Sequence, residues 1–169
     1  MKKLIIASIT ALSLTACTDK IGYVDNAKLI NGYQEKIDIK AKLDVQVTNY
    51  QKKRDSISQA LQAEVLAFNK QAESLPESTR KKRYNGLFQK REILLQKLTK
   101  EEQELKAETQ KQLDSLITKM KKNIREYGKK KGYSLIIGAN DSGNLLYGSE
   151  SKDITNDVLE YLNQQYKNK

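Results

Sequence analysis

The spacing of apolar residues between Ala27 and Lys131 constrains the fold of this chain more than any other feature. Apolar residues, and a few polar residues that such a pattern tolerates, recur there at alternating steps of three and four residues. Such spacing keeps one narrow apolar stripe on an α-helix and is typical of a coiled-coil seam. The seam positions of the first half are Leu43, Val47, Tyr50, Arg54, Ile57, Leu61, Glu64, Phe68, Gln71 and Leu75. Those of the second half are Tyr84, Leu87, Arg91, Leu94, Leu98, Glu101 and Leu105, then a shifted run of Leu113, Leu116, Met120, Ile124 and Tyr127.

The only proline of the chain, Pro76, divides this stretch into two halves. One continuous helix is not expected there, because proline lacks an amide hydrogen and clashes with the preceding helical turn. We predict an antiparallel helical hairpin over residues 27–131, with its tip near residues 75–79 and Pro76 in the first turn of the second helix. At ~1.5 Å of rise per residue, this coiled-coil arm reaches on the order of 70 Å.

The positive charge of the chain is concentrated on this arm. The 169 residues carry a net charge of +10, and residues 28–131 hold 25 Lys and Arg against 14 Asp and Glu, an excess of 11. A basic surface attracts nucleic acid, anionic lipid or acidic protein segments, whereas a solvated coiled-coil exterior is the simpler alternative. With 31% charged residues and no tryptophan, the composition favours an elongated helical protein over a thick globular core.

The residue types needed for common catalytic sites are missing. The chain has one cysteine and no histidine, which excludes a disulfide within the chain and a metal site built on His or Cys. Without histidine, the usual pairing of a nucleophile with a base is also missing. We therefore predict that the protein is not an enzyme and uses no metal or cofactor.

The first 17 residues match a bacterial lipoprotein leader. Lys2 and Lys3 precede an apolar run at residues 4–14, which is too short to span a bilayer. Leu-Thr-Ala-Cys at residues 14–17 matches the lipobox, so we predict removal of residues 1–16 and lipidation of Cys17. This places the chain in the envelope of a Gram-negative-type bacterium. The alternatives are an ordinary secretory leader with a chance cysteine, or a buried cysteine.

The segments on both sides of the arm predict a small α+β body. Residues 17–26 hold the anchor and a first strand at 20–24, followed by the helix-capping residues Asp25 and Asn26. Residues 132–169 predict a β-hairpin and a final helix.

Within this C-terminal segment, residues 133–139 and 144–148 favour strands, with turn residues between them. Thr155 is the expected N-cap of the final helix, and Ile154 is placed to pack on Leu159. A body of some 45 residues is near the size at which a lone domain needs disulfides, metal or oligomerisation. Because its short strands also leave open edges, we predict a homo-oligomer held together at the body.

Two groups of arm residues are candidates for binding. A basic cluster beside the tip suits anionic groups of lipids or of acidic protein loops, although a solvated helix start would explain it equally. The members of this basic tip are Arg80, Lys81, Lys82 and Arg83. Several apolar residues lie off the predicted seam, where they either widen it or offer scattered, weak contacts to an unfolded chain. These residues are Val45, Leu66, Phe88, Ile93 and Leu95.

The chain resembles the Skp (OmpH) family of periplasmic chaperones in the order of its segments, over the whole chain that follows the leader. The resemblance is most specific at Ile-Gly-Tyr-Val-Asp of residues 21–25, Leu-Leu-Tyr of residues 145–147 and residues 153–159. It implies a homotrimer with a small β-barrel-like body and three helical-hairpin arms around a cavity. It also implies an ATP-independent holdase that keeps unfolded outer-membrane proteins in that cavity. Many members are soluble, whereas this chain is expected to be lipid-anchored.

We therefore predict a lipid-anchored trimeric holdase of the periplasm. Two other classes of protein stay open. A structural coiled-coil spacer lipoprotein of the envelope would not suppress aggregation of unfolded β-barrel proteins. A nucleic-acid-binding protein would use the basic arm, but the lipobox places the chain outside the cytoplasm, so no nucleic-acid partner is expected.

Overall fold

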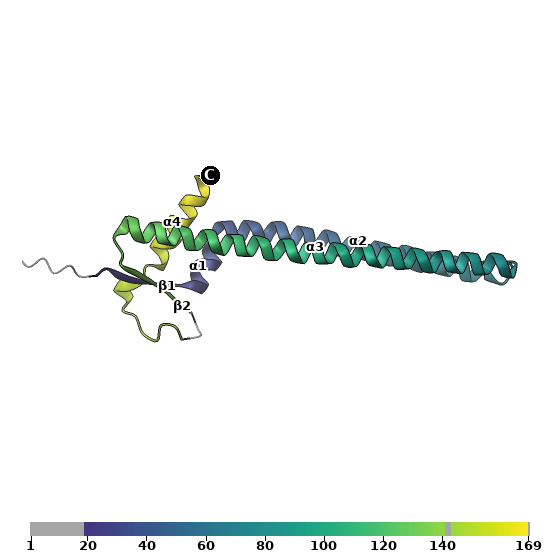
Figure 1. The fold of residues 1–169 in the computed structure, drawn as a ribbon, viewed down its shortest axis with the longest axis horizontal. Helices are drawn as coiled ribbons and strands as arrows, with labels where there is room; N and C mark the ends of the chain where they lie inside the picture. Colours follow the sequence, from purple (N-terminus) through teal and green to yellow (C-terminus); the bar gives the residue numbers. More distant parts are fainter. Residues whose placement is uncertain (1–18, 141–142, 169) are drawn as a thin grey trace, which may run out of the picture.

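The computed structural model describes residues 19–140 and 143–168. A long, thin arm of two helices projects from a small body that contains both strands and the last helix (Figure 1). The fold is therefore mostly helical with a small sheet, as the sequence predicted. The leader and Cys17 lie outside the described residues.

Helices α2 (Gln34–Ala72) and α3 (Glu77–Lys131) form the arm and lie side by side along its length (Figure 1). Pro76 immediately precedes α3 as its N-cap, one residue before the first helical turn in which the sequence placed it. Helix α3 ends at Gly132, whose φ of 72° lies in the left-handed region that favours glycine.

A short helix, α1 (Asn26–Gly32), precedes α2, and the sequence did not predict the break between them at Tyr33. Asn163 of the last helix spans this break. Its side-chain Oδ1 accepts a hydrogen bond from the Gln34 backbone N–H at 2.8 Å, and its Nδ2 donates to the Gly32 carbonyl at 3.3 Å. These bonds satisfy backbone groups that the interrupted helix leaves without helical partners.

Strands β1 (Ile21–Asp25) and β2 (Leu135–Ala139) form a parallel two-stranded sheet, with Ile21 opposite Leu135. The arm is the crossover that parallel pairing requires, because α3 returns the chain to the end of the body where β1 lies. On the other side of β1, Tyr23 forms a single parallel bridge to Asp153.

The predicted β-hairpin between residues 133–139 and 144–148 is wrong. Among the described residues, 144–148 form no strand, and β2 pairs with β1 instead. Leu146 and Tyr147 project into solvent, with 94% and 85% of their surfaces exposed. Strand-favouring composition alone therefore does not make residues 144–148 a strand in the single chain.

Helix α4 (Thr155–Lys167) closes the body over the sheet and the base of the arm. The predicted N-cap role of Thr155 is wrong, because Thr155 is already helical. The N-cap is Ile154, and the residue before it, Asp153, supplies the side-chain acceptor: its Oδ1 accepts from the Thr155 backbone N–H at 2.9 Å and from the Thr155 hydroxyl at 2.5 Å. The same hydroxyl accepts from the Asp25 N–H at 2.9 Å, which ties α4 to β1.

The buried core lies in the body and in the adjoining part of the arm. It brings together side chains from β1, α1, α3 and α4, so the root of the arm is part of the body's core. The members of this core are Val24, Leu29, Tyr33, Leu116, Met120, Tyr127, Ile154, Val158 and Leu162.

Candidate binding groove on the arm

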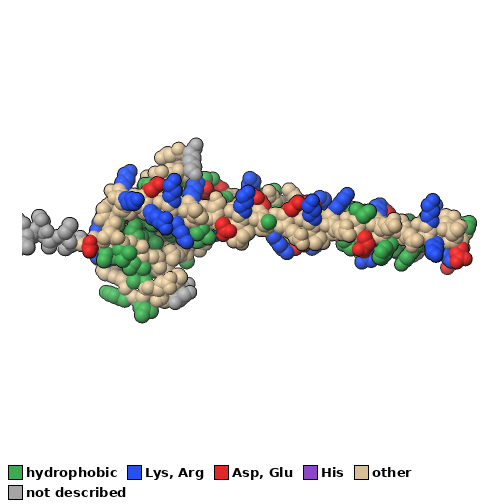
Figure 2. All heavy atoms as spheres, in the orientation of Figure 1, with side chains coloured by type: hydrophobic (Ala, Val, Ile, Leu, Met, Phe, Trp, Pro, Cys, Tyr) green, Lys and Arg blue, Asp and Glu red, His purple; other side chains and the backbone are tan. Residues whose placement is uncertain are grey.

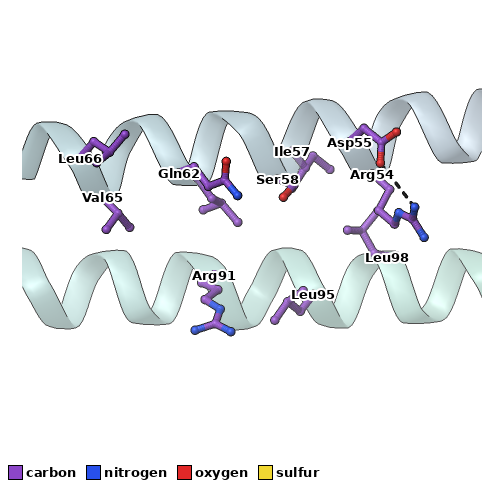
Figure 3. Close-up of a pocket in the computed structure, with 11 residues that line it drawn as sticks. Arg54, Asp55, Ile57, Ser58, Gln62, Val65, Leu66, Arg91, Leu95 and Leu98 are labelled. Carbon is purple, nitrogen blue, oxygen red and sulfur yellow. Dashed lines mark hydrogen bonds and ion pairs between the residues drawn. The ribbon is translucent and has the colours of Figure 1, made fainter.

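An open groove runs between α2 and α3 in the outer half of the arm. Its main cavity has a volume of about 860 Å³. Figure 3 shows Val65 of α2 pointing into the space between the helices, with Leu95 across from α2 on α3. The lining residues are Arg54, Asp55, Ile57, Ser58, Leu61, Gln62, Val65, Leu66, Arg91, Leu95 and Leu98.

A second cavity of about 150 Å³ continues the groove toward the tip and shares Leu61, Val65 and Arg91 with the first. Aromatic side chains dominate here, and the ring centroids of Phe68 and Tyr84 lie 6.5 Å apart. The further lining residues are Phe68, Asn69, Tyr84, Leu87 and Phe88. The two cavities together form one line of aliphatic and aromatic surface, which suits an extended apolar segment.

The groove is open because the seam between the two helices is poorly filled here. Arg54 and Arg91 occupy seam positions, and burying a guanidinium without a partner is costly. Val65 and Leu95 consequently remain 45% and 42% exposed. Closer to the body a further cavity of about 490 Å³ lies between the helices at Val47, Tyr50 and Leu105. Only beyond it is the seam filled by buried side chains, those of Leu43, Leu116 and Met120.

Ion pairs link the two helices near both ends of the main cavity. Lys53 of α2 pairs with Glu101 of α3 at 2.5 Å on the body side, and Glu64 pairs with Lys90 on the tip side. These side chains are partly exposed, so each pair contributes modestly to stability. The pairs hold the helices at a fixed spacing without filling the seam, which leaves the groove accessible.

Three of the five predicted apolar binding residues line the groove. Leu66 and Leu95 line the main cavity, and Phe88 lines the smaller one. Val45 and Ile93 are 59% and 53% exposed but line neither cavity. The structure thus brings Leu66, Phe88 and Leu95 together and leaves Val45 and Ile93 apart.

The basic tip lies in the first turns of α3, and all four of its side chains are exposed. Arg83 donates a hydrogen bond across the tip to the Gln71 side chain at 3.2 Å. None of the four residues lines either of the two cavities described above. Arg83 lines a further cavity of about 400 Å³ together with Phe68 and Leu87, which also line the smaller cavity of the groove. The basic tip therefore borders the apolar groove through Arg83.

Sequence reasoning missed Val65, which it assigned neither to the seam nor to the binding residues. A signal for the groove was nevertheless present. Arg54, Glu64, Gln71 and Arg91 interrupt the seam in the same stretch of the arm. Polar residues at seam positions weaken packing between helices, so their clustering marks where the seam opens.

Within residues 19–140 and 143–168, no group of three or more metal-ligating side chains comes together. Nor does any helix there combine the length and the apolarity that crossing a bilayer requires. The features that the described structure does show are a long basic arm, an accessible apolar groove and a small α/β body.

These features define an elongated helical-hairpin protein with an accessible apolar groove on its arm. The family model described as "Outer membrane protein (OmpH-like)" matches residues 20–162, and the chain belongs to this family. The resemblance drawn from the sequence is thereby confirmed. No match was found among curated proteins.

The fold is similar to a solved structure from Caulobacter crescentus CB15. That protein is provisionally described as an OmpH-like outer membrane chaperone. The two share 14% sequence identity with a TM-score of 0.77, over 87% of this chain and 85% of the other. At this identity the likeness establishes the fold of the arm and body.

Proposed function

We propose that this protein is an outer-membrane-protein chaperone that holds unfolded clients without ATP. The open groove on the arm is the observation that supports this most. Folded soluble proteins rarely leave such apolar surface exposed unless it binds something. Leu66, Phe88 and Leu95 contact apolar side chains of the client, and the positive excess of the arm attracts clients that are acidic.

The proposed assembly is a trimer joined through the body, with three arms around the client. β2 pairs with β1 along one edge, and within the described residues its other edge has no strand partner. This open edge and the exposed side chains of Leu146 and Tyr147 both favour association with another copy. Leu146→Ser together with Tyr147→Ser should reduce the mass measured by light scattering to that of smaller species, and an intact trimer would contradict this interface.

The proposed location is the periplasm, with the chain anchored to a membrane by lipid on Cys17. The lipobox at residues 14–17 supports this part of the proposal. Cys17→Ser should release the protein from the membrane fraction or leave its precursor uncleaved. Unchanged processing and fractionation of that variant would exclude the anchor.

An aggregation assay tests the holding activity. An unfolded outer-membrane protein is diluted from denaturant with or without the chaperone, light scattering is recorded, and the mass of the complex is measured. We expect suppression of aggregation without ATP, with one client per assembled chaperone. A coiled-coil spacer would leave the scattering unchanged.

A further inference from the structure

Four lysines gather at the end of the molecule opposite the arm tip. Lys20 precedes β1, and Lys129, Lys130 and Lys131 form the last turn of α3. The Lys20 ammonium donates a hydrogen bond to the Lys131 carbonyl at 3.0 Å and lies 4.2 Å from the centre of the Tyr133 ring. All four residues are exposed, and within the described ranges none forms an ion pair with a carboxylate.

An exposed apolar pair lies beside these lysines. Ile21 and Leu135 face each other in the sheet and are 40% and 49% exposed. The hydrogen bond from Ser134 N–H to the Lys20 carbonyl, at 2.9 Å, fixes the pair next to the lysines. Figure 2 shows hydrophobic and basic side chains together at this end of the body. We call Lys20, Ile21, Lys129, Lys130, Lys131 and Leu135 the anchor-side patch.

Helix electrostatics explains only part of this arrangement. Lysines in the last turn of a helix complement its dipole, which accounts for residues 129–131. It accounts neither for Lys20, which comes from the other end of the chain, nor for the exposed Ile21 and Leu135. Asp157 and Glu160 of α4 share a groove of about 380 Å³ with Lys130 and Lys131, and the exposed Asp19 directly precedes Lys20. These carboxylates reduce the positive charge of the four lysines in part.

We propose that the anchor-side patch binds an anionic phospholipid surface, a proposal that rests on lipidation of Cys17. Lys20 follows Cys17 by three residues, so even an extended chain holds it within about 10 Å of the acylated residue. This reach matches the Debye length of ~10 Å at 0.1 M salt, within which charges interact strongly. The lysines bind lipid phosphates, while Ile21 and Leu135 contact the boundary of the acyl region.

Vesicle co-sedimentation of an unlipidated protein tests the patch apart from the anchor. Residues 17–169 with Cys17→Ser retain every helix and strand of the described structure, since the first begins at Ile21. We expect binding to vesicles that contain phosphatidylglycerol and none to pure phosphatidylcholine. Gln at positions 20, 129, 130 and 131 should weaken binding at least tenfold, because each lysine near such a surface contributes about fivefold.

The basic tip supplies a matched control. Gln at positions 80–83 removes the same charge from the far end of the molecule and should change the affinity less than twofold. Equal losses in both variants would overturn the proposal, since they would show attraction by the whole basic chain. Loss of vesicle binding in the tip variant alone would also overturn the proposal, as would equal binding to vesicles with and without phosphatidylglycerol. Leu135→Ser should weaken binding about threefold with the charge unchanged.

The assay also separates this proposal from the proposed chaperone function. The variant with four replaced lysines at the anchor-side patch should still suppress aggregation, because none of these positions lines the groove. Failure of client holding in the wild-type protein would leave the vesicle result standing.

Discussion

Leu95 is the side chain on which the groove can be tested most directly. It lines the main cavity from α3 and is 42% exposed, whereas Ile93 lies two residues away, 53% exposed and outside both cavities. Leu95→Ser should raise the rate of client dissociation about fivefold, because losing a partial apolar contact costs ~1 kcal/mol. Ile93→Ser should change that rate less. Release rates measured by fluorescence would contradict the groove if the two variants lost binding equally.

Asp153 offers a pH-dependent test of the body. Burial raises the pKa of this carboxyl, but hydrogen bonds from Thr155 outweigh burial and hold the pKa below its ordinary value of 3.8. The folded state therefore gains stability that is complete above this ordinary value and is lost as the pH falls through the depressed folded value. Asp153→Ala should lower the melting temperature at pH 7 by about 2–4 °C, the effect of losing one cap.

Thermal melts followed by circular dichroism check this expectation. The difference between Asp153→Ala and wild type should narrow as the pH falls below 3.8. Asn156→Ala is the control, because Asn156 is exposed and belongs to the same helix. A difference that does not depend on pH would mean that Asp153 acts through packing.

At the scale of elements, one side-chain amide spans the break between α1 and α2. Asn163 joins Gly32 and Gln34 across the break with two hydrogen bonds. Asn163→Ala should destabilise the protein by about 1–3 kcal/mol, because it leaves partly buried backbone groups without partners. Urea unfolding measures this loss, and Gln164→Ala, on the exposed face of α4, should cost far less. Equal effects would show that water replaces the amide.

The root of the arm is held by a second set of contacts around Tyr33. Its hydroxyl donates to Glu35 at 2.5 Å, and Glu35 also pairs with Lys119 of α3. Burial and the Glu35 bond raise the pKa of Tyr33, so its hydroxyl stays protonated at neutral pH. The break between α1 and α2, together with the hydrogen bond and the ion pair of Glu35, fixes the direction in which the arm leaves the body.

The arm could be predicted from the sequence because its pattern is local. Heptad spacing and Pro76 place the two helices and the tip without knowledge of distant contacts. The body could not be predicted in the same way. Strand propensity identified residues 133–139, but their partner, residues 21–25, lies more than 100 positions earlier, beyond the reach of hairpin rules. The groove could be predicted only in part. Polar residues at seam positions indicate weak packing between the helices, but they do not show that a cavity forms there.

At the scale of the whole molecule, charge and apolar surface should act at different stages of binding. The basic tip is exposed and far from the body, and we propose that it attracts an acidic client before contact. Gln at positions 80–83 should therefore slow association severalfold at low salt and leave dissociation nearly unchanged. Stopped-flow rates at low and high salt test this, with the variant of residues 20 and 129–131 as an equally charged control. If the tip variant associates at the wild-type rate, the basic tip does not take part in capture and is only a solvated helix start.

The parallel pairing of β1 with β2 has a consequence for how the chain folds. β1 is synthesised first, yet its partner strand follows only after both arm helices. Closing so long a loop carries an entropic cost that grows slowly with length, and non-local contacts of this kind fold slowly. The helical hairpin removes much of this cost, because zipping α2 against α3 carries the later strand back to the earlier one. We therefore expect the arm to form before the body, which closes last.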